Sequence, residues 1–135
     1  MKKIIILLTF SLFISCEDEK NDSVNIDEAY VGIWIEEYSA DNTNADCSGN
    51  WVPDTSFIKK DYGIELKSDG TAIPYNTEMG IASVWSSNGA TGLYMNAIPL
   101  TFIETDGEWV MWMEMQASDM DNNPLYCYRV GYTKQ

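Results

Sequence analysis

The stretch Glu108–Gln116, EWVMWMEMQ, decides the fold because its side chains alternate between two kinds. One set of alternate positions is wholly apolar and consists of Trp109, Met111, Met113 and Met115. The other set includes Glu108 and Glu114, which favour water. A period of two is that of a β-strand with one buried face. The stretch is therefore predicted to be a strand whose tryptophan and methionines point inward.

Dipeptides typical of tight turns separate short apolar runs along the chain. Asp106-Gly107 precedes the first stretch, and Asp69-Gly70 and Asn88-Gly89 separate two other pairs of runs. Since Asp-Gly and Asn-Gly favour two-residue hairpins, the flanking runs are predicted to be antiparallel neighbours. The strand candidates are residues 30–38, 61–67, 71–75, 80–86, 90–96, 99–105, 108–115 and 124–132.

This series of candidates predicts an all-β fold, an antiparallel up-and-down meander of about eight strands. A meander of that size closes into a small barrel with room for a ligand, and closure removes unpaired strand edges. Residues 39–56, which follow the first candidate, are rich in Asn, Asp and Ser and show no period. They are predicted to form an irregular loop.

The inward faces carry an unusual share of aromatic and thioether groups. Methionine adapts to irregular shapes and tyrosine keeps a hydroxyl for hydrogen bonds, so these faces indicate a ligand cavity. A filled, adaptable core fits the same residues, and this alternative stays open. The candidate ligand-binding residues are Trp109, Met111, Met113, Met115, Tyr126, Tyr128, Tyr62 and Trp85.

The N-terminus has the pattern of an export signal. Lys2 and Lys3 precede the apolar run Ile4–Ile14, which is shorter than the about 20 residues of a membrane span. Ser15-Cys16 then resembles the lipobox of bacterial lipoproteins, with Phe13 where that pattern prefers Leu. The resemblance implies removal of residues 1–15 and acylation of Cys16, for example with palmitate. The protein would then be an outer-membrane lipoprotein, on the periplasmic face or the cell surface.

Beyond Cys16 the chain divides into an acidic tether, residues 16–28, and a single domain, residues 29–135. The two remaining cysteines, Cys47 and Cys127, enter an oxidising compartment and are predicted to form a disulfide, with two separate thiols as the alternative. The chain contains no histidine, which excludes Ser-His-Asp catalysis and His-ligated zinc. We expect a non-catalytic protein, although a hydrolase built on two carboxylates is not excluded.

The net charge and the possible metal-ligand motifs further limit which partners and metals are expected. The net charge of −13 repels phosphate backbones, so nucleic acid is not an expected partner. Asp119-x-Asp121-x-Asn123 begins like a calcium loop, but Pro124 stands where that loop needs glycine. The methionines of residues 111–115 lie too far apart along a strand to share one copper ion. No metal and no cofactor is expected, and a monomer is predicted.

Three short motifs resemble those of lipocalins. Gly32-Ile33-Trp34 is similar to their Gly-x-Trp signature, and Thr105-Asp106 to the Thr-Asp of a second one, with Gly107 in place of the following Tyr. Arg129 lies in the last strand candidate, where lipocalins place an arginine over that tryptophan. The resemblance implies structural roles for Gly32, Trp34 and Arg129. It also implies a barrel closed at the Trp34 end and open at the other.

We therefore expect a lipid-anchored, exported protein that holds a small apolar or amphipathic ligand in a lipocalin-like barrel. The alternative is a cell-surface module that binds glycan or protein. Trp51 and Trp85, near predicted loops or turns, would supply flat faces for sugars in that case.

Overall fold

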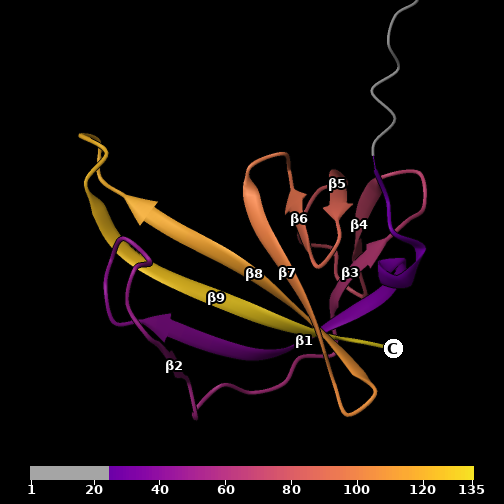
Figure 1. Ribbon diagram of the computed structural model, residues 1–135, viewed down its shortest axis with the longest axis horizontal. Coiled ribbons are helices and arrows are strands. Elements are labelled where there is room, and N and C mark those ends of the chain that lie inside the picture. Colours follow the sequence, from indigo (N-terminus) through magenta and orange to yellow (C-terminus); the bar gives the residue numbers. More distant parts are fainter. Residues whose placement is uncertain (1–24) are drawn as a thin grey trace, which may run out of the picture.

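A computed structural model describes residues 25–135, which form a short 3₁₀ helix and nine antiparallel strands (Figure 1). Strands β1 and β3–β9 close into a ring because β1 pairs with β3 on one side and with β9 on the other. The predicted all-β, up-and-down barrel is thus confirmed. The elements are η1 (Glu28–Tyr30), β1 (Gly32–Asn42), β2 (Trp51–Pro53), β3 (Gly63–Leu66), β4 (Thr71–Tyr75), β5 (Ser83–Asn88), β6 (Thr91–Tyr94), β7 (Ile98–Thr105), β8 (Glu108–Ser118) and β9 (Pro124–Lys134).

Strand β2 lies outside the ring and falls within the segment predicted to be irregular. It pairs with the far end of β1, Ala40–Asn42, which extends beyond the predicted strand. The Asn42 side chain organises the intervening loop: its amide donates to the Cys47 and Gly49 carbonyls, and its oxygen accepts from the Gly49 N–H. Side-chain hydrogen bonds of this kind carry no periodic sequence signal, so sequence periodicity missed the strand.

The end of the barrel next to η1 is closed by aromatic packing. Trp34 is fully buried and its indole donates to the Tyr30 carbonyl at 2.9 Å. The Tyr30 ring stacks on Phe102 with centroids 3.8 Å apart, and Trp109 meets Tyr30 edge-on at 5.3 Å. This half of the interior is a filled core whose largest fully buried side chains are Trp34, Trp85, Leu66, Leu100 and Met111.

A bulge in β1 changes which side chains face the interior. The β1–β9 register shifts between Glu36, which pairs with Tyr132, and Tyr38, which pairs with Gly131. Regular alternation from Trp34 turns Glu36 inward beside Tyr132 and Glu37 outward. Because the bulge adds one residue, Tyr38 points outward as well. An alternation counted from Trp34 alone would turn Tyr38 inward.

The outer face of β8 and β9 carries a second cluster of packed side chains, and the predicted disulfide lies on the same face. Cys47 and Cys127 are bonded, with Cα atoms 5.3 Å apart, which confirms the pairing and ties the β1–β2 loop to β9. The Arg129 guanidinium lies between the rings of Trp51 and Trp112, 4.6 and 4.0 Å from their centroids. We call Trp51, Trp112 and Arg129 the outer stack.

The outer stack corrects the role that the lipocalin resemblance implied for Arg129. This side chain does not cover Trp34, because Val130 and Tyr132 share the inner face of β9 and Arg129 faces the other way. The basic residue paired with Trp34 is Lys134, whose ammonium donates to the Ala29 carbonyl beside η1.

The N-terminal segment joins the barrel earlier than the sequence indicated. The Asn25 carbonyl accepts from the Ser87 N–H at 2.9 Å, and the Ser87 hydroxyl accepts from the Asp27 N–H. Residues 25–28, assigned by sequence to the tether, therefore contact β5. The predicted signal peptide, Cys16 and the rest of the predicted tether lie outside the described residues. Within residues 25–135, no helix is both long and apolar enough to cross a membrane.

Candidate functional site

The open end of the barrel, opposite η1, contains a cavity of about 350 Å³, which we call the mouth cavity. Its floor and walls come from β1, β3, β4, β6 and β9, and its rim from the β4–β5 and β6–β7 loops. A volume of this size suits a small organic molecule. The lining residues are Glu36, Tyr62, Gly63, Ile64, Pro74, Thr77, Met79, Gly80, Ile81, Tyr94, Met95 and Tyr132.

Glu36 is the one carboxylate among these described lining residues, and it shares the inner face of β1 with Trp34, two residues earlier. Burial raises the pKa of Glu36, and the nearby charge of Lys60 opposes that rise. Within residues 25–135 its carboxylate takes part in no hydrogen bond and no ion pair; the Lys59–Glu37 pair is the single salt bridge there. Glu36 therefore presents an uncompensated carboxylate to the cavity.

Three tyrosines line the same cavity as this carboxylate. Tyr132 lies opposite Glu36 across the β1–β9 pair, Tyr94 is in β6, and Tyr62 precedes β3. Burial raises the pKa of Tyr94. Burial also raises the pKa of Tyr132, and the negative charges of Glu36, Tyr94, Tyr62 and Tyr128 raise it further.

The rim of the mouth cavity is apolar and exposed. Met79, Ile81 and Met95 leave 83%, 72% and 46% of their surfaces accessible. Exposed apolar side chains gathered around an opening are typical of binding sites. The cavity thus combines a polar floor with an apolar entrance, an arrangement that suits an amphipathic molecule.

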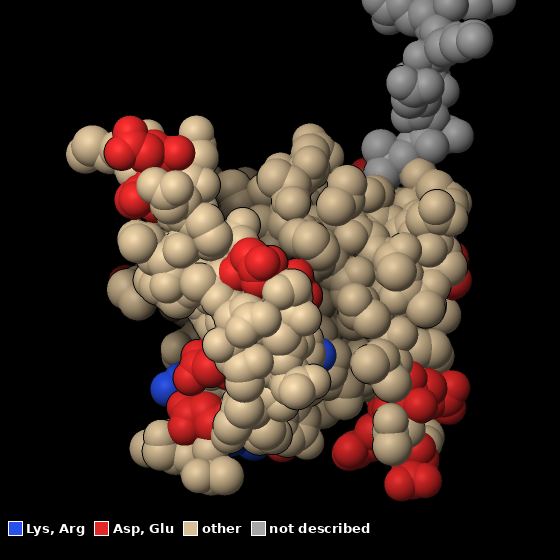
Figure 2. All heavy atoms as spheres, turned by 60° about the vertical axis from the view of Figure 1, so that its left-hand side comes forward, with Lys and Arg blue, Asp and Glu red and all other residues tan. Residues whose placement is uncertain are grey.

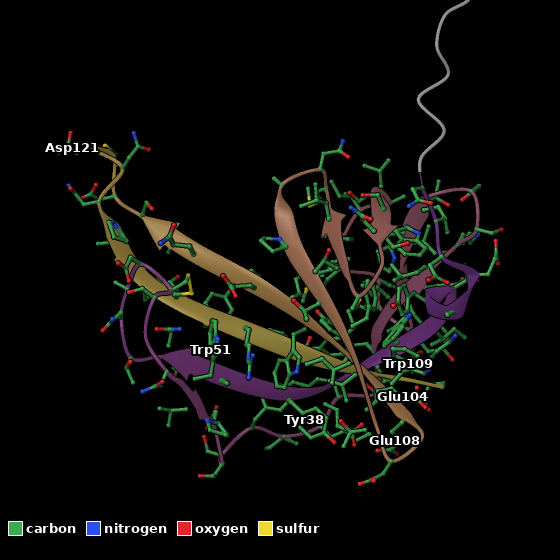
Figure 3. All side chains as sticks on the ribbon, in the orientation of Figure 1. Tyr38, Trp51, Glu104, Glu108, Trp109 and Asp121 are labelled. Atoms are coloured by element: carbon green, nitrogen blue, oxygen red, sulfur yellow. A yellow bond between two sulfur atoms is a disulfide. The ribbon has the colours of Figure 1, made fainter. Side chains whose placement is uncertain are left out.

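The predicted ligand-binding residues fall into three separate places. Tyr62 lines the mouth cavity. Trp85, Met111 and Met113 are at most 5% exposed and belong to the filled core, and Trp109 packs against that core on the η1 side (Figure 3). None of these four lines the mouth cavity or either of the two other hollows described below. The remaining three residues, Met115, Tyr126 and Tyr128, line a different hollow.

That second hollow, about 630 Å³, lies where the β8–β9 hairpin extends beyond the barrel wall. The β7–β8 pairing ends at Leu100 and Met113, whereas β9 follows β8 as far as Ser118. Residues 114–118 of β8 therefore have an unpaired edge, beside which the hollow opens. Much of its wall is exposed, including Tyr126 at 56%, so it encloses a ligand less than the mouth cavity does.

Sequence reasoning missed Glu36, Tyr94 and Tyr132 as a group. A parity signal existed, because Glu36 is two residues from the inward Trp34 and Tyr132 shares a face with Tyr128. A carboxylate on the face of a strand is normally solvated, so Glu36 carries no local sign of a cavity. The chain order offers no sign that residues 36, 94 and 132 meet.

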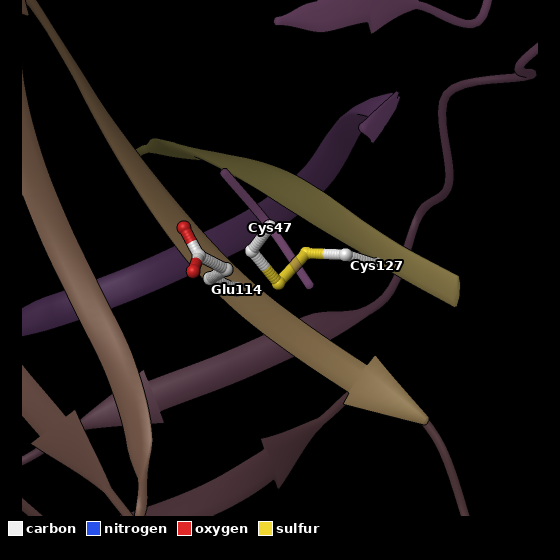
Figure 4. Close-up of side chains that lie close together, drawn as sticks. All are labelled: Cys47, Glu114 and Cys127. Atoms are coloured by element: carbon white, nitrogen blue, oxygen red, sulfur yellow. A yellow bond between two sulfur atoms is a disulfide. The ribbon is translucent and has the colours of Figure 1, made fainter. Parts of the chain in front are cut away.

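The metal-ligand patterns have structural explanations in the described residues. Sulfur atoms of Cys47 and Cys127 and a carboxylate oxygen of Glu114 lie within 4.8 Å of one another (Figure 4). The two sulfurs are bonded in the disulfide, so they are not free thiolate ligands. The Asp119 carboxylate accepts from the N–H groups of Asp121 and Asn123 and so closes the β8–β9 turn.

A third hollow, about 630 Å³, lies on the outside of the barrel. Tyr38, which is 40% exposed, and Trp112 form an aromatic shelf there, with ring centroids 6.1 Å apart. Glu108 and Asp106 add carboxylates to its wall. Figure 3 labels Tyr38 of β1, Trp51 of β2 and Glu108 at the start of β8.

Comparisons with known proteins add no relative: the chain matches no family model, no curated protein and no solved structure. The fold is a small closed antiparallel barrel of eight strands, consistent with a lipocalin-like fold.

Proposed function

We propose that this protein is a lipid-anchored, exported binding protein that holds a small apolar or amphipathic molecule in the mouth cavity. The observation that carries the proposal is an open cavity of about 350 Å³ within a closed barrel, with a half-buried polar floor and an exposed apolar rim. The anchoring part rests on the sequence of residues 1–16, in which Cys16 is the acylated residue.

A non-catalytic role accords with the chemistry of the site. Glycoside hydrolysis needs two facing carboxyl groups, and among the described lining residues the mouth cavity has Glu36 alone. The chain supplies no histidine as a general base. The visible face in Figure 2 carries scattered carboxylates and few cationic groups, which supports the exclusion of nucleic acid as a partner.

The test is binding of a neutral naphthylamine dye, whose fluorescence rises in apolar surroundings, to the full chain in lipid nanodiscs. We expect a saturable signal above that of empty discs. Met79→Glu places a charge on the rim and should weaken binding about tenfold, because the dye would lose an apolar contact. Met120→Glu is the matched control, since Met120 is fully exposed on the β8–β9 turn. A signal no greater than that of empty discs would refute the proposal.

The aromatic shelf of Tyr38 and Trp112 favours a second candidate, a surface module that binds glycan. Sugars stack on flat aromatic faces while carboxylates accept their hydroxyl hydrogen bonds. A glycan array probed with the wild-type chain and with Tyr38→Ala tests this. Hits that Tyr38→Ala abolishes would support the candidate, and an array without hits would remove it.

A further inference from the structure

We propose that the mouth cavity selects a small organic ammonium ion, whose cationic head lies between the Glu36 carboxylate and the rings of Tyr62, Tyr94 and Tyr132. This inference rests on the proposed function, because it names the class of ligand that the same cavity takes. The ligand is an amine or quaternary ammonium with an apolar portion directed to the rim.

The Glu36 carboxylate has no counter-charge in direct contact within the described chain. A carboxylate removed from water is costly unless a cation or hydrogen bonds compensate it. Glu36 is half-buried, and neither kind of partner reaches its carboxylate within the described chain. A cation entering the cavity would supply that compensation, whereas an anionic ligand would meet repulsion.

Lys60 is the cation that acts on Glu36 from within the protein, so its position matters. Its ammonium lies 5.2 Å from the centroid of the Phe57 ring and is not within 4.0 Å of a Glu36 oxygen. The pKa of Glu36 stays raised in spite of Lys60. Lys60 therefore leaves the carboxylate open to a ligand's ammonium group.

The tyrosines provide the second half of a cation site. Aromatic faces attract ammonium groups through the ring quadrupole, and the attraction grows when water is excluded. The hydroxyls of Tyr62, Tyr94 and Tyr132 take part in no hydrogen bond of the described chain and can accept from an ammonium N–H. A ring and a hydroxyl from each of three walls suit a compact cationic head.

An inorganic cation fits this site less well. Calcium takes six to eight oxygen ligands, several of them carboxylates, and the described walls offer one carboxylate and neutral phenols. The apolar rim residues Met79, Ile81 and Met95 would also have no contact with a bare ion. The overall charge of −13 raises the local concentration of any cation, which assists encounter without deciding its class.

The test compares three ligands that share a phenyl group and differ in charge: phenethylammonium, 2-phenylethanol and 3-phenylpropanoate. Calorimetry uses the full chain in zwitterionic nanodiscs, with empty discs as the blank. We expect phenethylammonium to bind about tenfold or more tighter than the alcohol, and the carboxylate to bind weakest. Glu36→Gln should abolish this preference while leaving the alcohol's affinity nearly unchanged.

Glu37→Gln is the matched control. It removes the neighbouring carboxylate, which points outward to Lys59 and Thr133, and should leave the preference intact. If Glu36→Gln does not fold, the wild-type protein provides the test. Its preference for phenethylammonium over 2-phenylethanol should disappear when acidification protonates Glu36. A preference that persists below about pH 4, where ordinary glutamates are protonated, contradicts the inference.

The outcomes separate this inference from the proposed function. If the naphthylamine dye binds but phenethylammonium binds no better than the alcohol, the cation site is refuted and the binding function stands. If neither the dye nor any of the three ligands binds, both are refuted.

Discussion

At the scale of single residues, Glu36 and Glu37 are chain neighbours with opposite electrostatic environments. Burial raises the pKa of Glu36. Burial also acts to raise the pKa of Glu37, but hydrogen bonds from Lys59 and Thr133 outweigh it and leave that pKa below its ordinary value. The difference follows from the alternation along β1, which turns Glu36 into the mouth cavity and Glu37 outward toward Lys59 and Thr133.

These shifts predict opposite effects on stability. A raised folded-state pKa means that the charge of Glu36 opposes folding at neutral pH, and the cost is relieved as pH falls through that pKa. We therefore expect Glu36→Gln to raise the melting temperature at pH 7, and the gain to vanish in acid. Glu37→Gln should lower it at pH 7, because the contribution of a lowered pKa is lost only as pH falls through it. Thermal melts of both variants from pH 3 to 7 measure the two effects. The same change in melting temperature for both variants would contradict the opposite pKa shifts of Glu36 and Glu37.

Gly63 is required by a close approach of two strands. A Cβ at this position would lie 1.9 Å from the Trp34 carbonyl oxygen, a backbone atom that cannot move aside alone. Gly63→Ala should cost about 3 kcal/mol of unfolding free energy, by separating β1 from β3. Gly89→Ala, where a Cβ meets nothing but φ is +60°, should cost about 1 kcal/mol from backbone strain. Urea unfolding would compare them, and equal losses would contradict the close approach.

At the scale of elements, the outer stack holds β2 on the barrel. Strand β2 has three residues and pairs with β1 on one side. Such a short edge strand needs side-chain contacts to persist, and Arg129 provides one by lying between Trp51 and Trp112. The contact places charge against two rings, and the buried Arg129 Nε has no hydrogen-bond partner in the described chain, which limits its net benefit.

Removing Trp51 should release β2 without opening the ring. We expect Trp51→Ala to cost about 1–2 kcal/mol, the range of a cation–π contact plus some burial. Hydrogen exchange should accelerate at the backbone N–H groups of residues 51 and 52 and stay unchanged in β7 and β8. Faster exchange throughout the barrel would show instead that the outer stack supports the whole fold.

At the scale of the whole molecule, the barrel is filled at one end and hollow at the other. Tryptophan and phenylalanine side chains occupy the end that η1 closes, whereas smaller groups and tyrosines line the mouth. The disulfide lies outside this ring and links the β1–β2 loop to β9 across 80 residues. It therefore constrains the unfolded chain more than it shapes the mouth cavity.

The position of the disulfide outside the ring predicts that its removal affects stability but not ligand binding. Replacing Cys47 and Cys127 together by serine should lower the unfolding free energy by up to about 4 kcal/mol, because the long loop is no longer closed in the unfolded chain. Dye affinity at 15 °C should change less than about twofold, since neither cysteine lines the mouth cavity. Denaturant melts and dye titration measure the two effects. A lost affinity in a folded variant would contradict the separation of disulfide from cavity.

The local pattern of the chain determined the strands, the hairpins and the all-β meander. The alternation in residues 108–116 and the Asp-Gly and Asn-Gly turns depend on residues close together in the chain, so the sequence alone predicts them. The cysteine pair was likewise predictable, from the number of cysteines and the expected oxidising compartment. Of the residues predicted to bind ligand, Tyr62 lines the mouth cavity, whereas Met115, Tyr126 and Tyr128 line the second hollow.

Tertiary structure alone decided where the barrel is hollow. The packing of β1 against β9 placed Glu36 opposite Tyr132, and it includes a bulge that turned Tyr38 outward toward Trp112. The same packing buried Met111 and Met113 beneath aromatic rings, although their pattern resembles a cavity wall. These outcomes depend on the volumes and registers of strands far apart in the chain, which no local alternation encodes.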